Sequence, residues 1–170
     1  MRGIVLFLAG ILAGTIIETA VGQSQVAKPA VRLNHVAISV PDVGEALKYY
    51  GEKLGFREVV RNTNPQGQLM SAYIQVSRDT FIELQQANAQ RPAGLNHFGL
   101  EVSDIKGAVA AFRQRGLMVS EPGAPSAFTG GILANITDPN AGRIELSEQP
   151  PEGKLRKATE ASDIFEASPK

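Results

Sequence analysis

Apolar and polar residues alternate along the chain with periods that predict strands and helices in turn. Residues 33–40 alternate and are rich in β-branched side chains, which is typical of a strand. Pro41 ends this strand, and Asp42 is a favourable N-cap for a helix that runs to about Leu54, before Gly55. Further strands are predicted at residues 56–61, 69–76 and 80–86.

The same order of elements is predicted a second time. A strand at 95–103 is followed by a helix from Asp104 to Arg115, and Gly116 ends that helix. Strands are then expected near residues 117–121, 131–137 and 142–148. The predicted fold class is therefore α+β, with two tandem βαβββ modules at 31–87 and 94–149. The polar segment 150–170 is expected to be a loose C-terminal tail.

Two short phrases support an internal repeat. LNHVAISVPD at 33–42 is closely similar to LNHFGLEVSD at 95–104, and FIEL at 81–84 corresponds to RIEL at 143–146. One shift of 62 residues aligns both pairs, and it carries His35 onto His97 and Glu83 onto Glu145. Two phrases that agree at one common shift indicate a duplicated structural unit.

Strand parity places the histidine and the glutamate of each copy on the same face of the sheet. The only two histidines of the chain are His35 and His97, one in each copy. Because successive strand residues point to opposite faces, His35 and Glu83 lie on the sheet face away from the helix, and so do His97 and Glu145. Other residues predicted on this face are candidate pocket residues: Ser39, Tyr73, Gln75, Glu101, Asn135, Thr137 and Arg143. Of these, Arg143 suits an anionic substrate.

The repeated phrases resemble a known family. NHVAISVPDVGEALKYYGEKLGF is similar to the opening of vicinal-oxygen-chelate (VOC) proteins, the glyoxalase I, bleomycin-resistance and extradiol-dioxygenase group. TFIELQQ and GRIELSEQ resemble the closing strands of their modules. The resemblance covers about residues 31–149. It implies a glyoxalase/VOC fold whose two modules share a cleft, with a metal held by His35, Glu83, His97 and Glu145.

Taken singly, a strand histidine is usually a hydrogen-bonded structural residue, and a glutamate at a strand end is usually solvated. The common spacing and parity of the four residues favour a metal site instead. Two imidazoles and two carboxylates suit one divalent ion, namely Zn²⁺, Ni²⁺, Co²⁺, Mn²⁺ or Fe²⁺.

Three functions are compatible with this resemblance. The first is a glyoxalase I-like lyase or isomerase, in which Glu145 is the catalytic base and Glu83 its counterpart. The second is an extradiol-type ring-cleaving dioxygenase, in which His35, His97 and Glu145 hold ferrous iron. The third is a non-catalytic binding or resistance protein. Glutathione is a poor candidate substrate, because Glu83 is followed by LQQAN and not by the Asn-x-Gly stretch of glyoxalase I.

The amino-acid composition restricts the kinds of partner and chemistry that we expect. Seventeen basic and seventeen acidic residues cancel, so the sequence carries no nucleic-acid footprint and no polybasic membrane patch. The absence of cysteine excludes disulfides, zinc-thiolate sites and thiol nucleophiles. The expected partner is a small-molecule substrate, and a homodimer is compatible with the resemblance.

The first residues have the features of an export signal. Arg2 precedes a largely apolar run at 4–17, and Ala20-Val21-Gly22 provides a small-x-small cleavage pattern before Gln23. A membrane anchor is the alternative, although Glu18 interrupts the apolar run before it reaches the length of a spanning helix. We expect residues 1–22 to be a signal peptide. The mature protein would then be periplasmic or secreted, without stable membrane association.

Overall fold

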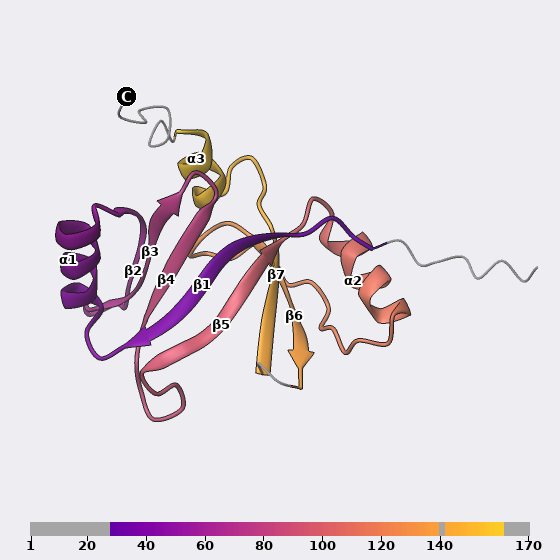
Figure 1. Ribbon diagram of the computed structural model, residues 1–170, viewed down its shortest axis with the longest axis horizontal. Helices are drawn as coiled ribbons and strands as arrows, with labels where there is room; N and C mark the ends of the chain where they lie inside the picture. The colour runs from indigo at the N-terminus through magenta and orange to yellow at the C-terminus, as the bar shows by residue number, and fades with distance from the viewer. Residues whose placement is uncertain (1–27, 140–141, 162–170) are drawn as a thin grey trace, which may run out of the picture.

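The computed structural model describes residues 28–139 and 142–161, and the expected signal peptide at 1–22 lies outside these residues. The described part contains seven strands and three helices (Figure 1). Their bounds are β1 Arg32–Val40, α1 Val43–Leu54, β2 Arg57–Thr63, β3 Leu69–Ser77, β4 Thr80–Gln86, β5 Gly94–Glu101, α2 Ile105–Gln114, β6 Ile132–Asp138, β7 Gly142–Glu148 and α3 Lys154–Glu160. None of the helices in these residues is long and apolar enough to cross a membrane.

Both long helices begin at the predicted aspartates. The side chain of Asp42 accepts a hydrogen bond from the backbone N–H of Glu45 at 2.9 Å, and Asp104 does the same for Gly107 at 3.0 Å. Helix α1 ends at Gly55, which adopts a left-handed conformation with φ 71°. Each strand-to-helix connection is therefore specified locally, in both halves of the chain.

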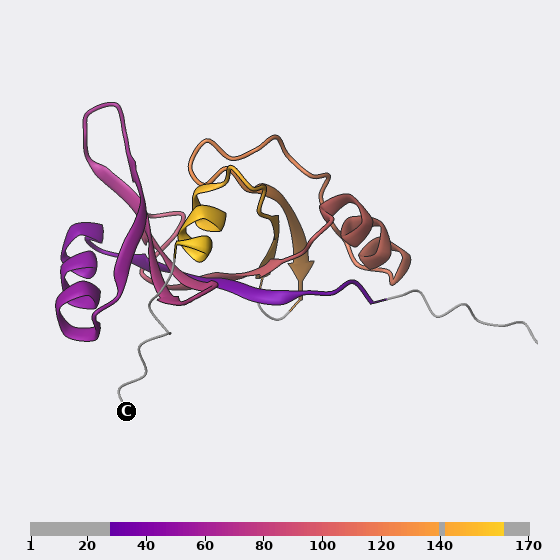
Figure 2. The ribbon, with the colours of Figure 1, turned by 90° about the horizontal axis from the view of Figure 1, so that it is seen from above.

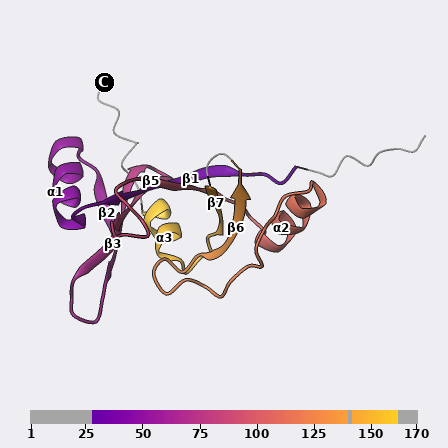
Figure 3. The same cartoon turned by 90° about the horizontal axis from the view of Figure 1, so that it is seen from below.

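The strands form one continuous sheet in the order β2-β3-β4-β1-β5-β7-β6. Strand β1 is parallel to β4, and β5 is parallel to β7. The two halves of the sheet meet where β1 pairs with β5 in antiparallel orientation. The sheet curves, and α1 and α2 lie outside the curve at its two ends (Figures 2 and 3). The predicted α+β fold of the VOC type is confirmed.

The second half departs from the predicted βαβββ pattern at residues 117–121. This segment makes only an isolated bridge between Val119 and Ile136, not a regular strand. Backbone hydrogen bonds still join this segment to β6, from the Thr137 N–H to the Met118 carbonyl at 3.1 Å and from the Ser120 N–H to the Asn135 carbonyl at 2.9 Å. The guanidinium of Arg113 donates to the backbone carbonyl of Val119 at 2.7 Å, and the backbone N–H of Asn135 donates to the hydroxyl of Ser120 at 2.9 Å. The segment thus follows β6 without forming a continuous ladder with it.

Within the described part of the segment after residue 150, the chain is not the loose tail that we predicted, because α3 forms at Lys154–Glu160. Leu155 and Ala158 are one helical turn apart and give α3 an apolar side in an otherwise polar sequence. Both are buried in a cluster with Val60, Tyr73 and Phe81. Helix α3 lies inside the curve of the sheet (Figure 2). The sequence prediction was wrong because two small apolar contacts are a weak signal without knowledge of the surface they meet.

Polar side chains, and not the apolar clusters, line the middle of the concave face, which is the inner side of the curved sheet. One cluster packs α1 against the outer side of module one, and another packs α2 against the outer side of module two. The third is the cluster under α3. Between them, the concave face is lined by buried polar side chains from β1, β4, β5 and β7: His35, Ser39, Glu83, His97, Glu101 and Glu145.

Candidate metal site

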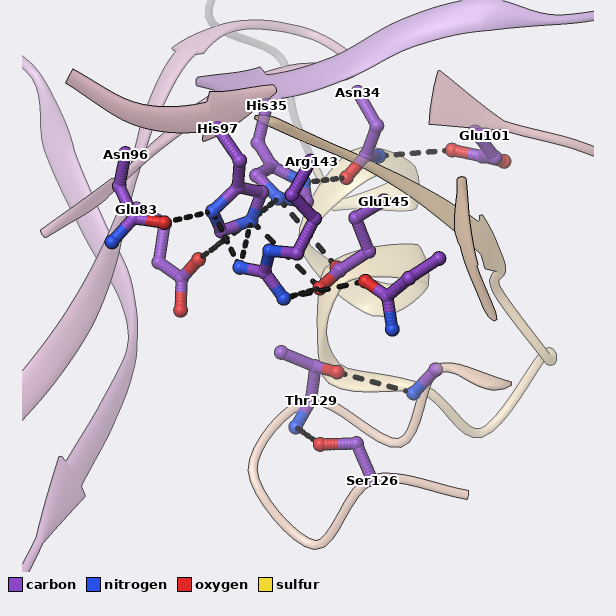
Figure 4. Close-up of polar contacts among 12 residues, drawn as sticks. Asn34, His35, Glu83, Asn96, His97, Glu101, Ser126, Thr129, Arg143 and Glu145 are labelled. Atoms are coloured by element: carbon purple, nitrogen blue, oxygen red, sulfur yellow. Dashed lines mark hydrogen bonds and ion pairs between the residues drawn. The ribbon is translucent and has the colours of Figure 1, made fainter. Parts of the chain in front are cut away.

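The four predicted side chains converge at the centre of the concave face (Figure 4). The Nε2 atoms of His35 and His97 are 3.3 Å apart. Glu83 Oε2 lies 3.9 Å from His35 Nε2 and 3.6 Å from His97 Nε2. The oxygens of Glu145 lie 3.6 Å from His35 Nε2 and 3.8 Å from His97 Nε2. Both imidazoles are almost completely buried.

Three of these residues lie close enough together to share one metal ion. One potential ligand atom each from His35, His97 and Glu145 can be chosen so that all lie within 4.8 Å of one another. Glu83 stands outside this trio, although its carboxylate reaches both imidazoles. The structure therefore contains a possible His-His-Glu metal site with a fourth candidate donor beside it.

The central strand pair explains how one chain assembles this site. In the β1–β5 pairing, His35 lies opposite Gly99 and His97 lies opposite Ala37. The ring of His35 occupies the space above Gly99, where an added Cβ would overlap it. Both modules come from one chain, so the cleft needs no second copy. Sequence reasoning missed Gly99, although a glycine inside a strand signals such a close approach.

An asparagine beside each histidine binds its other ring nitrogen. Asn34 Oδ1 is 2.9 Å from His35 Nδ1, and Asn96 Oδ1 is 2.8 Å from His97 Nδ1. An amide oxygen only accepts, so it favours a proton on Nδ1 and leaves the Nε2 lone pair directed at the site. The dipeptide Asn-His occurs in both copies of the repeat, and this signal could have identified both asparagines from sequence.

Burial controls the charges of the site. Desolvation, reinforced by Arg143, lowers the pKa of His35 to about 4 and that of His97 to about 3. Desolvation, followed by repulsion from Glu83, raises the pKa of Glu145 to about 7. Both histidines are therefore neutral near pH 7 and can donate a lone pair, whereas Glu145 exchanges its proton in this range.

The two carboxylates have different surroundings. Burial raises the pKa of Glu83, but a hydrogen bond with Gln85, the charge of Arg143 and a hydrogen bond with Tyr73 oppose the increase. Burial and the nearby Glu83 carboxylate raise the pKa of the Tyr73 hydroxyl well above its usual value. Tyr73 therefore remains a neutral hydrogen-bond donor.

Arg143 lies against the site on the β7 side. Its Nη2 is 2.6 Å from His97 Nδ1 and 3.0 Å from His97 Nε2. Its Nη1 is 3.5 Å from Glu145 Oε2 and 3.3 Å from Asn135 Oδ1. The side chain is 40% exposed, whereas those of the four candidate ligands are nearly buried. Arg143 is thus the cationic group that links the site to solvent.

The other predicted pocket residues divide into three groups. Tyr73, Asn135 and Arg143 adjoin the four central residues. Gln75 instead binds Arg57 and the backbone of Ala158, and Thr137 is exposed. Ser39 and Glu101 contact the asparagines that hold the two histidines, at 3.3 and 3.0 Å.

Paired modules around a central His–Glu cluster define a protein of the VOC class. A family model described as "Glyoxalase/Bleomycin resistance protein/Dioxygenase superfamily" matches residues 34–134. The chain belongs to this superfamily.

The relatives found by sequence similarity are all named as lactoylglutathione lyases. A protein of Arabidopsis thaliana named "Probable lactoylglutathione lyase, chloroplastic" is 28% identical over 71% of this chain, and the match spans 36% of its own length. A protein of Synechocystis sp. named "Probable lactoylglutathione lyase" is 29% identical over 67% of this chain and 92% of its own length. The chain therefore corresponds to about a third of the first relative and to nearly all of the second.

Solved structures have the same fold but different names. Methylmalonyl-CoA epimerase from Mycobacterium tuberculosis is 25% identical, with a TM-score of 0.59 over 70% of this chain and 88% of that one. A 2,3-dioxygenase from Pseudomonas sp. KL28 is 22% identical, with a TM-score of 0.58 over 69% of this chain and 42% of that one. The fold alone therefore does not select a reaction.

Proposed function

We propose that this protein is a divalent-metal-dependent lyase or isomerase, similar to glyoxalase I, that moves a proton on a small oxygenated substrate able to chelate the metal. The observation that carries the proposal is the buried cluster of two neutral imidazoles and two carboxylates around one point. Relatives named as lactoylglutathione lyases and a structural neighbour named as an epimerase support a lyase or isomerase.

The donor set suits a divalent ion. We propose His35, Glu83, His97 and Glu145 as its ligands, with Zn²⁺, Ni²⁺, Co²⁺, Mn²⁺ or Fe²⁺ as the candidates. Burial of two carboxylates without a cation is unfavourable, as the raised pKa values of Glu83 and Glu145 indicate. When bound, a divalent ion polarises a substrate carbonyl and acidifies the adjacent C–H.

Glu145 is the proposed base. In the metal-free site, burial and the Glu83 carboxylate raise its pKa to about 7, and it lies beside the partly exposed Arg143, on the side where a substrate can approach. Glu83 has hydrogen bonds with Tyr73 and Gln85, so it suits the role of a fixed ligand on the opposite side. The four buried side chains also exclude bulk water from the place where the proton moves.

Arg143 is the proposed contact for a negatively charged group of the substrate. Its guanidinium lies beside His97 and Glu145, and it is more exposed than either. A planar guanidinium can bind a carboxylate through two parallel hydrogen bonds. This contact would orient the substrate with its acidic C–H near Glu145.

Metal content and reaction assays test the proposal. Protein purified without chelator is expected to contain about one divalent ion per chain by elemental analysis, and removal of the ion should lower the melting temperature. The ion-loaded protein should convert a methylglyoxal–thiol adduct or another 2-oxo compound, with exchange of the substrate proton in deuterated water.

Three results would overturn the proposal. Turnover of a catechol with oxygen consumption would favour the dioxygenase alternative. Tight ligand binding without turnover would favour a binding or resistance protein. Protein without metal, whose melting temperature ignores all five ions, would remove the basis of both metal-dependent functions.

We also propose that the protein is exported and acts in the periplasm or outside the cell. The proposal rests on the basic start, the apolar run and the Ala20-Val21-Gly22 pattern. Mass spectrometry of the mature protein should find Gln23 at its N-terminus. An intact Met1 in a membrane fraction would instead identify an anchor.

A further inference from the structure

The two asparagines that hold the histidines have different second partners. Asn34 Nδ2 donates to Glu101 Oε2 at 3.0 Å, whereas Asn96 Nδ2 donates to Ser39 Oγ at 3.3 Å. The 62-residue shift of the repeat carries Ser39 onto Glu101. Each asparagine is therefore bound by the equivalent position of the other module, but that position is a carboxylate in one case and a hydroxyl in the other.

Glu101 is a buried carboxylate outside the four proposed ligands. Its Oε1 accepts hydrogen bonds from Arg32 at 2.7 Å and from Arg156 of α3 at 3.1 Å. Its Oε2 is left to accept from Asn34 (Figure 4). Two guanidinium groups thus compensate the charge of Glu101 and fix its orientation.

The hydrogen bonds that link Glu101, Asn34 and His35 can run in only one direction, from donor to acceptor. An ionised carboxylate can only accept, so the NH₂ group of Asn34 must face Glu101. The amide oxygen of Asn34 then faces His35 Nδ1, which must carry the proton. The lone pair of His35 is consequently on Nε2, directed at the proposed metal.

The equivalent hydrogen bonds between Ser39, Asn96 and His97 can run in either direction. A hydroxyl both donates and accepts, so Ser39 is compatible with either orientation of the Asn96 amide. In addition, Arg143 Nη2 lies 2.6 Å from His97 Nδ1 and 3.0 Å from His97 Nε2, and a guanidinium can only donate, so it can donate to either ring nitrogen. These contacts therefore do not fix the tautomer of His97.

We infer that Glu101 is a positioning residue that fixes the Nδ1–H tautomer of His35 through Asn34, and that His97 has no equivalent device. The consequence for metal binding rests on the proposed function. His35 would be the pre-organised ligand, while His97 would adjust its tautomer when the ion arrives. A partner of this kind, one residue removed from a ligand, typically changes metal affinity by about 10–100-fold.

Nitrogen NMR of the metal-free, full-length protein tests the inference directly. Because the chain has only two histidines, ¹⁵N-histidine labelling gives four ring signals. In the unsubstituted protein His35 should be a single Nδ1–H tautomer, and His97 should be a mixture. In Glu101→Gln the side-chain amide can donate as well as accept, so His35 should also become a mixture. Its Zn²⁺ affinity should fall about tenfold.

Two further variants separate positioning from a structural role. Arg156→Gln removes the contact between α3 and Glu101 but leaves Asn34 bound, so the His35 tautomer and the Zn²⁺ affinity should not change. The double substitution Asn34→Asp with Glu101→Gln reverses donor and acceptor. The amide at 101 then donates to the carboxylate at 34, which accepts from His35 Nδ1, so the single tautomer should return.

Two results would overturn the inference. One is an Nε2–H tautomer of His35 in the unsubstituted protein, which needs no variant to fold. The other is a folded Glu101→Gln protein with the His35 signals and Zn²⁺ affinity unchanged. If the unsubstituted protein binds no ion but His35 is a pure Nδ1–H tautomer that Glu101→Gln abolishes, the positioning role stands and the proposed metal function fails.

Discussion

Each module supplies one histidine and one glutamate to the central cluster, but the residues around these pairs differ between the modules. On the concave face of module one, Tyr73 and Phe81 are buried beneath α3. The 62-residue shift carries them onto Asn135 and Arg143 of module two, where the side chains are polar and Arg143 is partly exposed. The concave face of module one therefore carries buried apolar side chains at these positions, whereas that of module two carries polar ones.

This difference indicates how a duplicated unit acquires an asymmetric function. The histidines and glutamates retain the symmetry of the repeat, which is sufficient for a metal site. The neighbours break the symmetry, because Glu83 is bound by Tyr73 and Gln85 while Glu145 lies beside Arg143. In the proposed reaction, Glu83 is the ligand, and Glu145 and Arg143 face the substrate.

The largest expected effect separates the two carboxylates. Glu145→Gln should lower the rate of substrate proton exchange by about 10²–10⁴-fold, because an amide cannot accept the proton. Glu83→Gln should chiefly weaken the binding of Zn²⁺ or Co²⁺, with activity recovered at high metal concentration. Exchange rates at saturating metal distinguish the two, and the exposed Glu121→Gln serves as the control. Equal rate losses in both glutamate variants would contradict the division of roles.

The second prediction concerns α3, which covers module one only. Leu155 is 1% exposed against Val60, Tyr73 and Phe81. Leu155→Ala should lower the free energy of unfolding by about 2 kcal/mol or more, because it leaves a cavity in this cluster. Urea denaturation of the metal-free protein measures the change. The control is Leu95→Ala, which is 76% exposed and should change stability by less than about 0.5 kcal/mol. Similar losses in the two variants would show that α3 adds no stability.

The third prediction compares the residues that face the two histidines. Gly99→Ala would place a Cβ where the His35 ring lies, so the ring must move and Zn²⁺ affinity should fall about 10–100-fold. The matched change at the equivalent position, Ala37→Gly, only removes atoms and should alter the affinity much less. Competition with a fluorescent chelator measures both constants. Unchanged affinity in Gly99→Ala would mean that His35 is not a ligand.

The smallest effect is the pH dependence of metal binding. Both histidine pKa values are lowered, to about 4 and about 3, so the imidazoles bind no competing proton at pH 5–8. The pKa of Glu145 is raised to about 7, so its proton competes with the ion below that pH. Zn²⁺ affinity should fall up to about tenfold per pH unit below pH 7 and level off above it.

Calorimetry in buffers of different ionisation enthalpy should detect about one released proton. Glu145→Gln should abolish this dependence, and an unaltered slope in that variant would assign the proton to another group.

Much of the fold could be predicted from local signals. The aspartate caps, the glycine after α1 and the alternating strands specified the element order, and the repeat specified the topology. Residues 117–121 could not be predicted in the same way. Their apolar pattern is that of a strand, and their backbone does bond to β6, but the pairing is limited to a single bridge between Val119 and Ile136.

The convergence of His35, Glu83, His97 and Glu145 was predictable because parity and a common shift are properties of the sequence. Their surroundings were less predictable. The bond between Asn34 and Glu101 joins residues 67 positions apart, and the contact of α3 with Tyr73 depends on the curvature of the sheet. Such contacts depend on the register of β1 against β5, which local periodicity does not contain.

The antiparallel pairing of β1 with β5 has a consequence for either half on its own. Separated from its neighbour, each would present the hydrogen-bonding groups of a long, uncovered edge strand and would be prone to associate with other chains. Each would also hold only one histidine and one glutamate of the central cluster. Tandem fusion therefore covers these two edges with each other, and the same strand pair brings the two histidines together.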